Sequence, residues 1–135
     1  MTKAENPQSY PVDHLALRGA ADAPALLTGD RVLSFGDLDA AVGRLASWLL
    51  AEAGGPGERV ASWGAKSRAT CLLPLAAARA ELIHVPVNPL LKGAQVAHIL
   101  ADSGAKLLVT NRSRADMLGD GLPDDCALQD LKLAE

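Results

Sequence analysis

The apolar residues between Phe35 and Ala53 repeat with the period of an α-helix. They recur at intervals of three or four positions, the spacing that places side chains on one helix face. The repeating residues are Leu38, Val42, Leu45 and Leu49, with Ala41, Ala46 and Ala53 on the same flank. Ser34 and Asp37 have the spacing of an N-terminal capping box, and Gly54 begins a glycine-rich stop. The pattern predicts an amphipathic helix over residues 35–53.

Two short apolar runs precede this helix. Residues 25–28 and 31–33 flank Gly29-Asp30, and a two-residue turn containing glycine between apolar runs predicts a β-hairpin. Further upstream, Leu15, Leu17 and Ala21 lie in a stretch with helical patterning that ends near Pro24. Residues 1–12 are polar and predict a flexible leader.

Strands and helices alternate after the long helix. The expected strands cover residues 59–63, 82–87 and 106–110, and the expected helices cover residues 67–80, 95–103 and 113–118. The run 82–87 is almost continuously apolar, which is typical of a strand buried on both faces of a parallel sheet. We expect Ser67 and Ser113 to cap the helices that they begin.

This alternation predicts an α/β fold, with a mostly parallel sheet flanked by helices and preceded by a small β-hairpin. The α/β segment spans residues 13–118. Residues 119–135 are turn-rich and acidic, and they predict an irregular tail with one apolar run near its end.

Composition excludes several classes of protein. The 135 residues include 13 Lys and Arg against 16 Asp and Glu, for a net charge of −3, and aromatic residues make up only 3%. Such a chain offers neither a basic field for nucleic acid nor a series of rings on which bases could stack. Its longest apolar stretch, residues 71–82, contains Pro74 and Arg79, so no membrane span is expected.

The location is predicted to be cytoplasmic. The first residues, 1–7, lack the basic and then apolar layout of a signal peptide. Cys71 and Cys126 have no CxxC spacing and no neighbouring histidine set, so we expect two free thiols in a reducing compartment.

No residue pattern identifies a catalytic, cofactor-binding or metal site. Gly54–Gly57 follows a helix and predicts a helix stop, and Gly64–Ser67 lacks the glycines of a phosphate loop and predicts a capped helix start. The three histidines, His14, His84 and His98, are isolated in the sequence. His84 lies in an apolar strand and is expected to be a hydrogen-bonded core residue. Neighbouring carboxylates at Asp124-Asp125 point apart in an extended segment, so no shared acid–base role is expected.

Five segments, in this order and spacing, resemble the opening of AMP-forming acyl-CoA synthetases, members of the adenylate-forming superfamily. They are Ala23–Leu26, Leu33–Leu38, Gly57–Ala61, Val85–Pro89 and Ile99–Lys106. A narrower resemblance, to the exosortase-A-associated acyl-CoA ligases, rests on residues 86–92, 96–100 and 109–114. The resemblance implies an incomplete, N-terminal part of an adenylation domain.

The resemblance implies a two-step reaction for the complete enzyme. A carboxylate attacks ATP to form an acyl-adenylate, and coenzyme A then takes the acyl group, with Mg²⁺ assisting the first displacement. The family's phosphate loop, acidic ribose contact and catalytic lysine come later in its members and match no residue here. The resemblance therefore assigns no catalytic, cofactor-binding or metal residue to this chain, which is expected to be inactive alone, and implies ATP, Mg²⁺ and coenzyme A for the complete enzyme only.

One position departs from the family pattern. Glu81 stands where the family has glycine in a left-handed helix end, and a glutamate there costs about 1 kcal/mol if the backbone is kept.

Three functions remain open at this point. The chain is an N-terminal portion of an acyl-CoA ligase, or a non-catalytic module that complements a separate ligase chain, or an independent flavodoxin-like domain that binds a small ligand at its strand ends. In the first case its partner is the remainder of the ligase polypeptide. We also expect an isolated piece to self-associate through an open strand edge and an uncovered apolar face.

Overall fold

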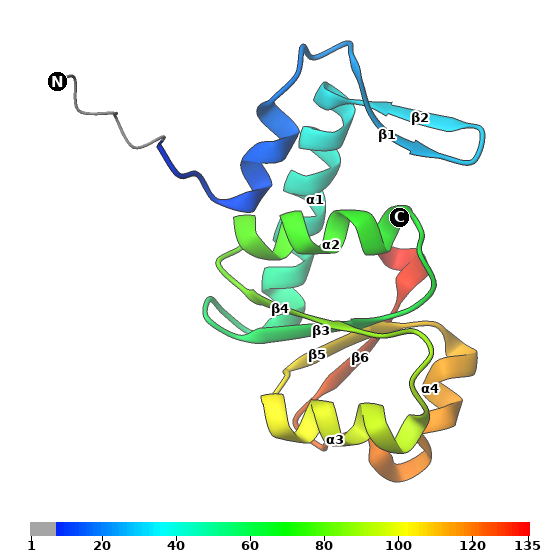
Figure 1. Cartoon of the computed structure of the whole chain (residues 1–135). Coiled ribbons are helices and arrows are strands. Elements are labelled where there is room, and N and C mark those ends of the chain that lie inside the picture. The colour runs from blue at the N-terminus through cyan, green and yellow to red at the C-terminus, as the bar shows by residue number, and fades with distance from the viewer. Residues whose placement is uncertain (1–7) are drawn as a thin grey trace, which may run out of the picture.

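A parallel sheet of four strands lies between two layers of helices (Figure 1). The strands are β3 (Arg59–Trp63), β4 (Ile83–Val87), β5 (Leu107–Thr110) and β6 (Ala127–Asp130). Their spatial order is β4-β3-β5-β6, and every neighbouring pair is parallel. This computed structural model describes residues 8–135, so most of the expected leader, residues 1–7, lies outside the described residues.

The helices divide between the two faces of the sheet, which confirms the α/β architecture. On one face lie α1 (Phe35–Ala53) and α2 (Arg68–Arg79), and on the other lie α3 (Gly93–Ser103) and α4 (Arg112–Leu118) (Figure 1). Strand β5 shows why both layers are needed. Leu107 packs into the cluster under α1 and α2, whereas its neighbour Leu108 packs into the cluster under α3, and both are fully buried.

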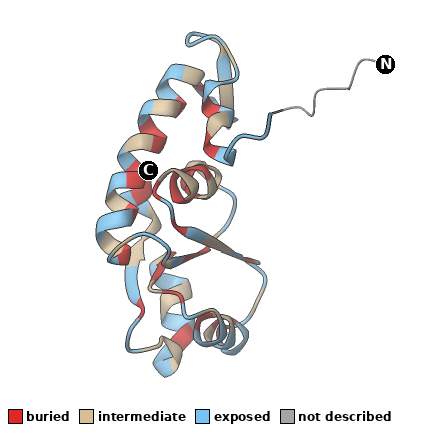
Figure 2. Ribbon diagram, turned by 90° about the vertical axis from the view of Figure 1, so that its left-hand side faces the viewer, coloured by how far each residue is buried: buried red, intermediate tan, exposed pale blue. Residues whose placement is uncertain are grey.

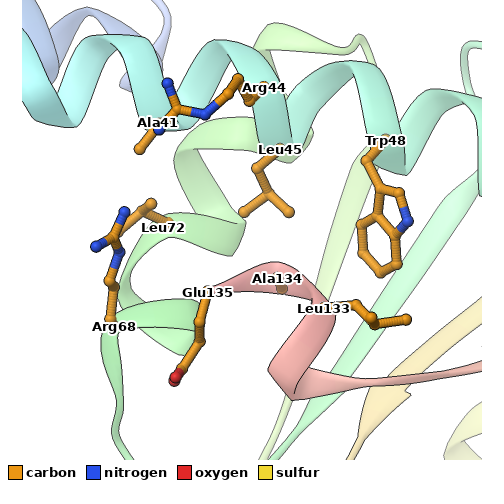
Figure 3. A pocket seen from close by; sticks show the side chains of 9 residues that line it. All are labelled: Ala41, Arg44, Leu45, Trp48, Arg68, Leu72, Leu133, Ala134 and Glu135. Atoms are coloured by element: carbon orange, nitrogen blue, oxygen red, sulfur yellow. The ribbon is translucent and has the colours of Figure 1, made fainter.

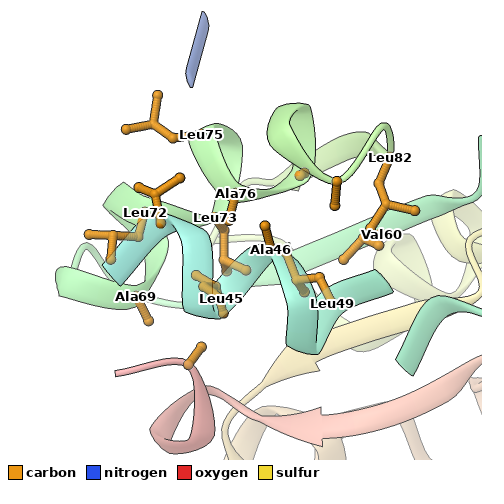
Figure 4. Packing of buried hydrophobic residues seen from close by; sticks show 14 of the residues in the cluster. Leu45, Ala46, Leu49, Val60, Ala69, Leu72, Leu73, Leu75, Ala76 and Leu82 are labelled. Carbon is orange, nitrogen blue, oxygen red and sulfur yellow. The ribbon is translucent and has the colours of Figure 1, made fainter. Parts of the chain in front are cut away.

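The larger core lies between α1, α2 and the sheet (Figure 4). It is aliphatic and rich in alanine, whose small side chains let the two helices approach each other closely. The labelled residues in Figure 4 are Leu45, Ala46, Leu49, Val60, Ala69, Leu72, Leu73, Leu75, Ala76 and Leu82. The buried positions of α1 are those that the sequence period predicts.

The start and end of α1 also agree with the sequence. The Ser34 hydroxyl accepts a hydrogen bond from the Asp37 amide at 3.1 Å, which satisfies one of the free N–H groups of the first turn. Gly54 ends the helix with a φ of 88°, a left-handed conformation that costs glycine little.

The expected hairpin is present and projects away from the sheet (Figure 1), and most of its residues are exposed or half-buried, the pale blue and tan classes of Figure 2. Strands β1 (Pro24–Thr28) and β2 (Arg31–Ser34) pair antiparallel around Gly29-Asp30. Leu33 is buried, but the cross-strand pair of Leu27 and Val32 is exposed by 70% and 56%. The hairpin therefore has one face in contact with the domain and an apolar pair on the other.

The prediction that residues 82–87 are buried on both faces is wrong. β4 is an edge strand, with Ile83 49% exposed and Pro86 also exposed. Pro86 has no N–H to donate, and proline is tolerated in sheets mainly at an edge. An apolar run measures hydrophobicity but not the place of its strand in the sheet, so it could not distinguish this edge from the buried centre.

The helix expected before Pro24 is much shorter in the structure. The chain forms a six-residue 3₁₀-helix, η1 (Val12–Leu17), in which Leu15 and Leu17 are more than half exposed. Asp13 and Ala16 are its buried residues. Asp13 is buried because it faces a guanidinium group on α2, so a polar contact decides the orientation of this segment.

Two further expectations near the C-terminal end need correction. Asn111, not Ser113, caps α4, because the Asn111 side-chain oxygen accepts from the Arg114 amide at 2.9 Å. Strand β6 lies within residues 119–135, for which the sequence predicts only an irregular tail. Its four residues become a strand because β5 offers a parallel edge with which to pair. Short 3₁₀-helices, η2 (Gly119–Gly121) and η3 (Leu131–Ala134), lie on either side of β6.

Glu81 adopts the left-handed backbone that the family resemblance implies for this position. Its φ is 59°, and it is the one non-glycine residue with a positive φ among residues 8–135. The Leu82 amide donates to the Ala77 carbonyl at 2.8 Å and the Glu81 amide to the Ala78 carbonyl at 3.1 Å. This pair of hydrogen bonds is the Schellman arrangement that ends a helix, and glycine is its usual residue at the Glu81 position.

Glu81→Gly relieves the steric cost of the left-handed backbone, and this gain exceeds the cost of the extra freedom that glycine gives to the unfolded chain. We therefore expect the substitution to stabilise the chain by about 1 kcal/mol. Urea unfolding of the two proteins measures the change. Glu58→Gly serves as the control, since Glu58 is not a positive-φ residue, and it should not stabilise. If the Glu81→Gly protein is less stable than the parent, the left-handed backbone at Glu81 carries no steric cost.

Candidate functional site

The carboxyl edge of the parallel sheet is the usual ligand-binding edge in folds of this class. In open parallel sheets, ligands bind where the strand order reverses, and here it reverses between β3 and β5. That position is filled by the protein itself. A Cβ added to Gly64 would lie 2.5 Å from Leu131 Cδ1, so the Leu131 side chain lies directly against the end of β3. The Thr110 hydroxyl also donates to the Trp63 carbonyl across the two strand ends.

A hollow of about 300 Å³ does lie at this edge, but one strand further along. It opens between the ends of β5 and β6 and the start of α4. Its lining residues are Thr110, Asn111, Arg112, Ala115, Asp116, Leu128, Gln129 and Asp130. Since this hollow is not at the reversal of strand order, the geometry does not favour the flavodoxin-like ligand domain.

The two glycine-containing segments have the structural roles that the sequence predicts. Gly54–Gly57 connects α1 to the amino end of β3, and Gly54 ends the helix. Gly64–Ser67 leads into α2, where Ser67 and Thr70 form a reciprocal capping box. The Ser67 amide donates to Thr70 Oγ1 at 2.7 Å, and the Thr70 amide donates to Ser67 Oγ at 3.3 Å. The Ser67 hydroxyl is thus engaged in holding the helix start.

His84 forms the hydrogen bond that the sequence predicts, but it is half-buried on an edge strand and is not a core residue. Its Nε2 lies 2.8 Å from Ser62 Oγ on the neighbouring strand β3. Burial lowers the pKa of the His84 imidazole below its usual range. A serine and a histidine in contact resemble part of a hydrolase triad, but no carboxylate is hydrogen-bonded to His84 among the described residues. The pair therefore satisfies two polar groups inside the sheet.

This burial makes folding stability depend on pH. Because the folded-state pKa of His84 is lowered, the unfolded chain binds a proton first as pH falls below about 6.5. The free energy of unfolding should fall below that pH and recover above it. In His84→Gln the loss between pH 7.5 and 5.5 should be smaller, as measured by urea unfolding at both values. Equal losses in the parent and in His84→Gln would contradict this role, and His98→Gln is the matched control.

The remaining candidate groups do not come together. Cys126 is buried, and this burial raises the pKa of its thiol to about 11. Cys71 is half-buried, and neither cysteine forms a disulfide bond. The Lys106 ammonium lies 3.0 Å from Asp125 and lowers the pKa of that carboxyl. Among residues 8–135, no three His, Cys, Asp or Glu side chains are grouped as metal ligands. In the same part of the chain, no helix is both long and apolar enough to cross a membrane.

A groove lined by arginines is the feature that sequence reasoning missed. Arg44 on α1 and Arg68 on α2 line two neighbouring hollows, of about 260 and 380 Å³, and Arg31 on β2 lines the second of them. Figure 3 shows Arg44 and Arg68 reaching from their two helices into the same opening. The three residues are far apart in the sequence. The only local signal was on α1, where Arg44 shares a helix face with Ala41 and Trp48.

Comparison with known proteins gives consistent matches. The family model described as "AMP-binding enzyme" matches residues 12–133. Novobiocin biosynthesis protein H of Streptomyces niveus is 34% identical over 106 residues, covering 78% of this chain and 18% of its own length. The mitochondrial medium-chain acyl-CoA ligase ACSF2 of Pongo abelii is 38% identical over 88 residues, covering 65% of this chain and 14% of its own length. The chain thus spans less than a fifth of these curated relatives.

A solved structure shares the fold. Apo MatB from Rhodopseudomonas palustris superposes with a TM-score of 0.80 at 22% identity, covering 90% of this chain and 27% of MatB. MatB has also been solved with ATP bound. At this identity the likeness shows the fold alone.

Proposed function

Since the chain belongs to the AMP-binding enzyme family, we propose that it is the N-terminal part of the adenylation domain of an ATP-dependent acyl-CoA ligase. The observation that carries the proposal is the family match over residues 12–133, which covers the whole α/β unit. The fold supports it, because the sheet and its helices correspond to part of MatB with a TM-score of 0.80.

The proposed reaction has two steps. A carboxylate oxygen attacks the α-phosphorus of ATP and pyrophosphate leaves, which gives an acyl-adenylate. The sulfur of coenzyme A then attacks the acyl carbon and AMP leaves. Relatives with acyl-CoA ligase names, such as ACSF2, support coenzyme A as the acceptor. The resemblance of residues 86–92 to exosortase-A-associated acyl-CoA ligases favours the same acceptor and that subgroup.

The described residues do not fit the ATP phosphates or Mg²⁺. In the loop after β3, the Ser67 hydroxyl is engaged in the capping box of α2. The Leu131 side chain fills the space next to Gly64 in the same loop. The glycine-rich run 54–57 lies at the opposite, amino end of β3. We therefore propose that this part supplies the scaffold on which the remaining adenylation domain is built. Free Cys71 and Cys126 support a cytoplasmic location for the enzyme.

A chimera tests the proposal. Residues 12–133 replace the matching segment of MatB, and carboxylate-dependent ATP–pyrophosphate exchange is measured with a panel of carboxylic acids beside unmodified MatB. We expect the chimera to retain exchange, because the two segments share a fold, and the 135-residue chain alone to show none. MatB with the segment deleted is the control and should be inactive. A folded chimera with no more exchange than the deletion would refute the proposal, as would exchange by the chain alone.

A further inference from the structure

The groove between α1, α2 and β2 has a basic lining that the rest of the chain does not balance. Arg31, Arg44 and Arg68 form no ion pair within residues 8–135, although the chain as a whole has a net charge of −3. The contrast with Arg79 is direct, since two aspartates bind that guanidinium group at 3.1 and 2.8 Å. The Arg68 Nε atom is buried and has no hydrogen-bond partner. A buried donor without a hydrogen-bond partner costs free energy, so the groove favours binding of an anionic partner.

The two carboxylates at the groove do not provide that partner. Asp37 and Glu135 line it, but neither forms an ion pair with the arginines. In Figure 3 the Glu135 carboxylate points away from both the Arg44 and the Arg68 guanidinium groups.

The walls between the arginines are apolar. Leu45, Leu72, Leu133 and the half-buried Trp48 line one hollow, and Val32 lines the other, with Val32 56% and Leu133 61% exposed. A small hydrated anion would leave these apolar side chains in water. An occupant that carries carboxylates and apolar side chains together would cover both kinds of surface.

We infer that this groove docks an acidic, amphipathic polypeptide segment from the remainder of the adenylating enzyme. The inference rests on the proposed function for the existence of that remainder. Nearly three quarters of MatB has no counterpart in this chain, since the match covers 27% of it. Glu135 itself lines the groove, so a polypeptide joined to it starts there. Arg44 and Arg68 bind carboxylates of the segment, and its apolar side chains pack on Trp48 and Leu133.

Trp48 allows docking to be measured on the 135-residue chain. The chain has two tryptophans, and Trp63 is fully buried in the other core cluster, so a change in fluorescence reports on Trp48. The probe is a synthetic 12-residue peptide with glutamate and leucine at helical spacing. A peptide with lysine in place of glutamate, and inorganic phosphate, are the comparison ligands. Trp48→Phe verifies the origin of the signal.

We expect the acidic peptide to shift Trp48 fluorescence and to bind more weakly as salt increases. Arg44→Gln together with Arg68→Gln should weaken binding by about tenfold or more, because the two substitutions remove charge-assisted hydrogen bonds to the peptide. Arg112→Gln, an exposed arginine on α4, should bind like the parent. Arg44→Gln alone should also weaken binding. Because Arg44 is exposed on α1, this single variant keeps the test valid if the double variant does not fold.

Four results would overturn the inference. In the first, the double variant binds the acidic peptide as well as the parent does, and in the second, the lysine peptide binds as well as the acidic one. In the third, phosphate changes Trp48 fluorescence as strongly as the acidic peptide does. In the fourth, Trp48 fluorescence changes with protein concentration when no peptide is present. The phosphate response would indicate a small-anion site, and the concentration dependence would indicate a second copy of the chain. The proposed function fails separately, through the MatB chimera, which does not use this readout.

Discussion

Leu49→Ala is expected to destabilise the chain by about 3 kcal/mol. Leu49 lies on α1 in the core shared with α2, and its side chain is fully buried. Replacing it removes apolar contacts and leaves a cavity, and such changes in well-packed cores cost about 2 to 5 kcal/mol. Urea unfolding followed by circular dichroism measures the effect. The urea concentration at the midpoint should fall, while the slope of the unfolding free energy against urea concentration stays the same.

The neighbouring residue provides a matched control. Leu50 lies on the same helix but is 36% exposed, so Leu50→Ala makes the same chemical change with the same effect on helix propensity. We expect it to cost less than about 1 kcal/mol. Equal losses at the two positions would mean that α1 does not pack against the sheet as the structure shows.

Arg79→Met is expected to cost about 2 to 3 kcal/mol. Arg79 on α2 donates from Nε to Asp13 on η1 at 3.1 Å and from Nη2 to Asp39 on α1 at 2.8 Å, and its Nη1 donates to the Asp39 carbonyl. The Asp13 side chain is only 12% exposed, so the substitution leaves a nearly buried carboxylate unpaired. Fully buried pairs cost about 3 to 5 kcal/mol when one partner is removed, and the 25% exposure of Arg79 reduces the effect.

Two variants separate this cause from simple loss of a surface charge. Lys106→Met breaks an exposed pair with Asp125 and should change stability much less than Arg79→Met does, because water and salt screen exposed pairs. Adding Asp13→Asn to Arg79→Met should recover part of the loss, because it removes the unpaired buried charge. If Arg79→Met behaves like Lys106→Met in urea unfolding, the three-way contact does not hold η1 to the helices.

The local features of the chain could be determined from the sequence alone. The period of apolar residues predicts α1, Gly29-Asp30 predicts the hairpin turn, and the alternation of elements predicts a parallel sheet with helices on both faces. The left-handed helix end at Glu81 was implied by the resemblance to acyl-CoA synthetases, whose pattern has glycine there. The helix period and the hairpin turn depend on interactions within a few residues, so the sequence pattern records them directly. The parallel sheet follows from the order of the elements, because short crossovers through helices bring successive strands together in parallel.

Tertiary structure alone decided the order of the strands and the surroundings of the polar groups. β4 is an edge strand and residues 127–130 become β6, because pairing depends on which edge a distant strand offers. Asp13 is buried only because Arg79 faces it, and His84 meets Ser62 through the register of β3 and β4. The arginine groove joins residues of β2, α1 and α2 that no local pattern relates. These contacts arise between segments far apart in the chain, and a local sequence period contains no information about which segments meet.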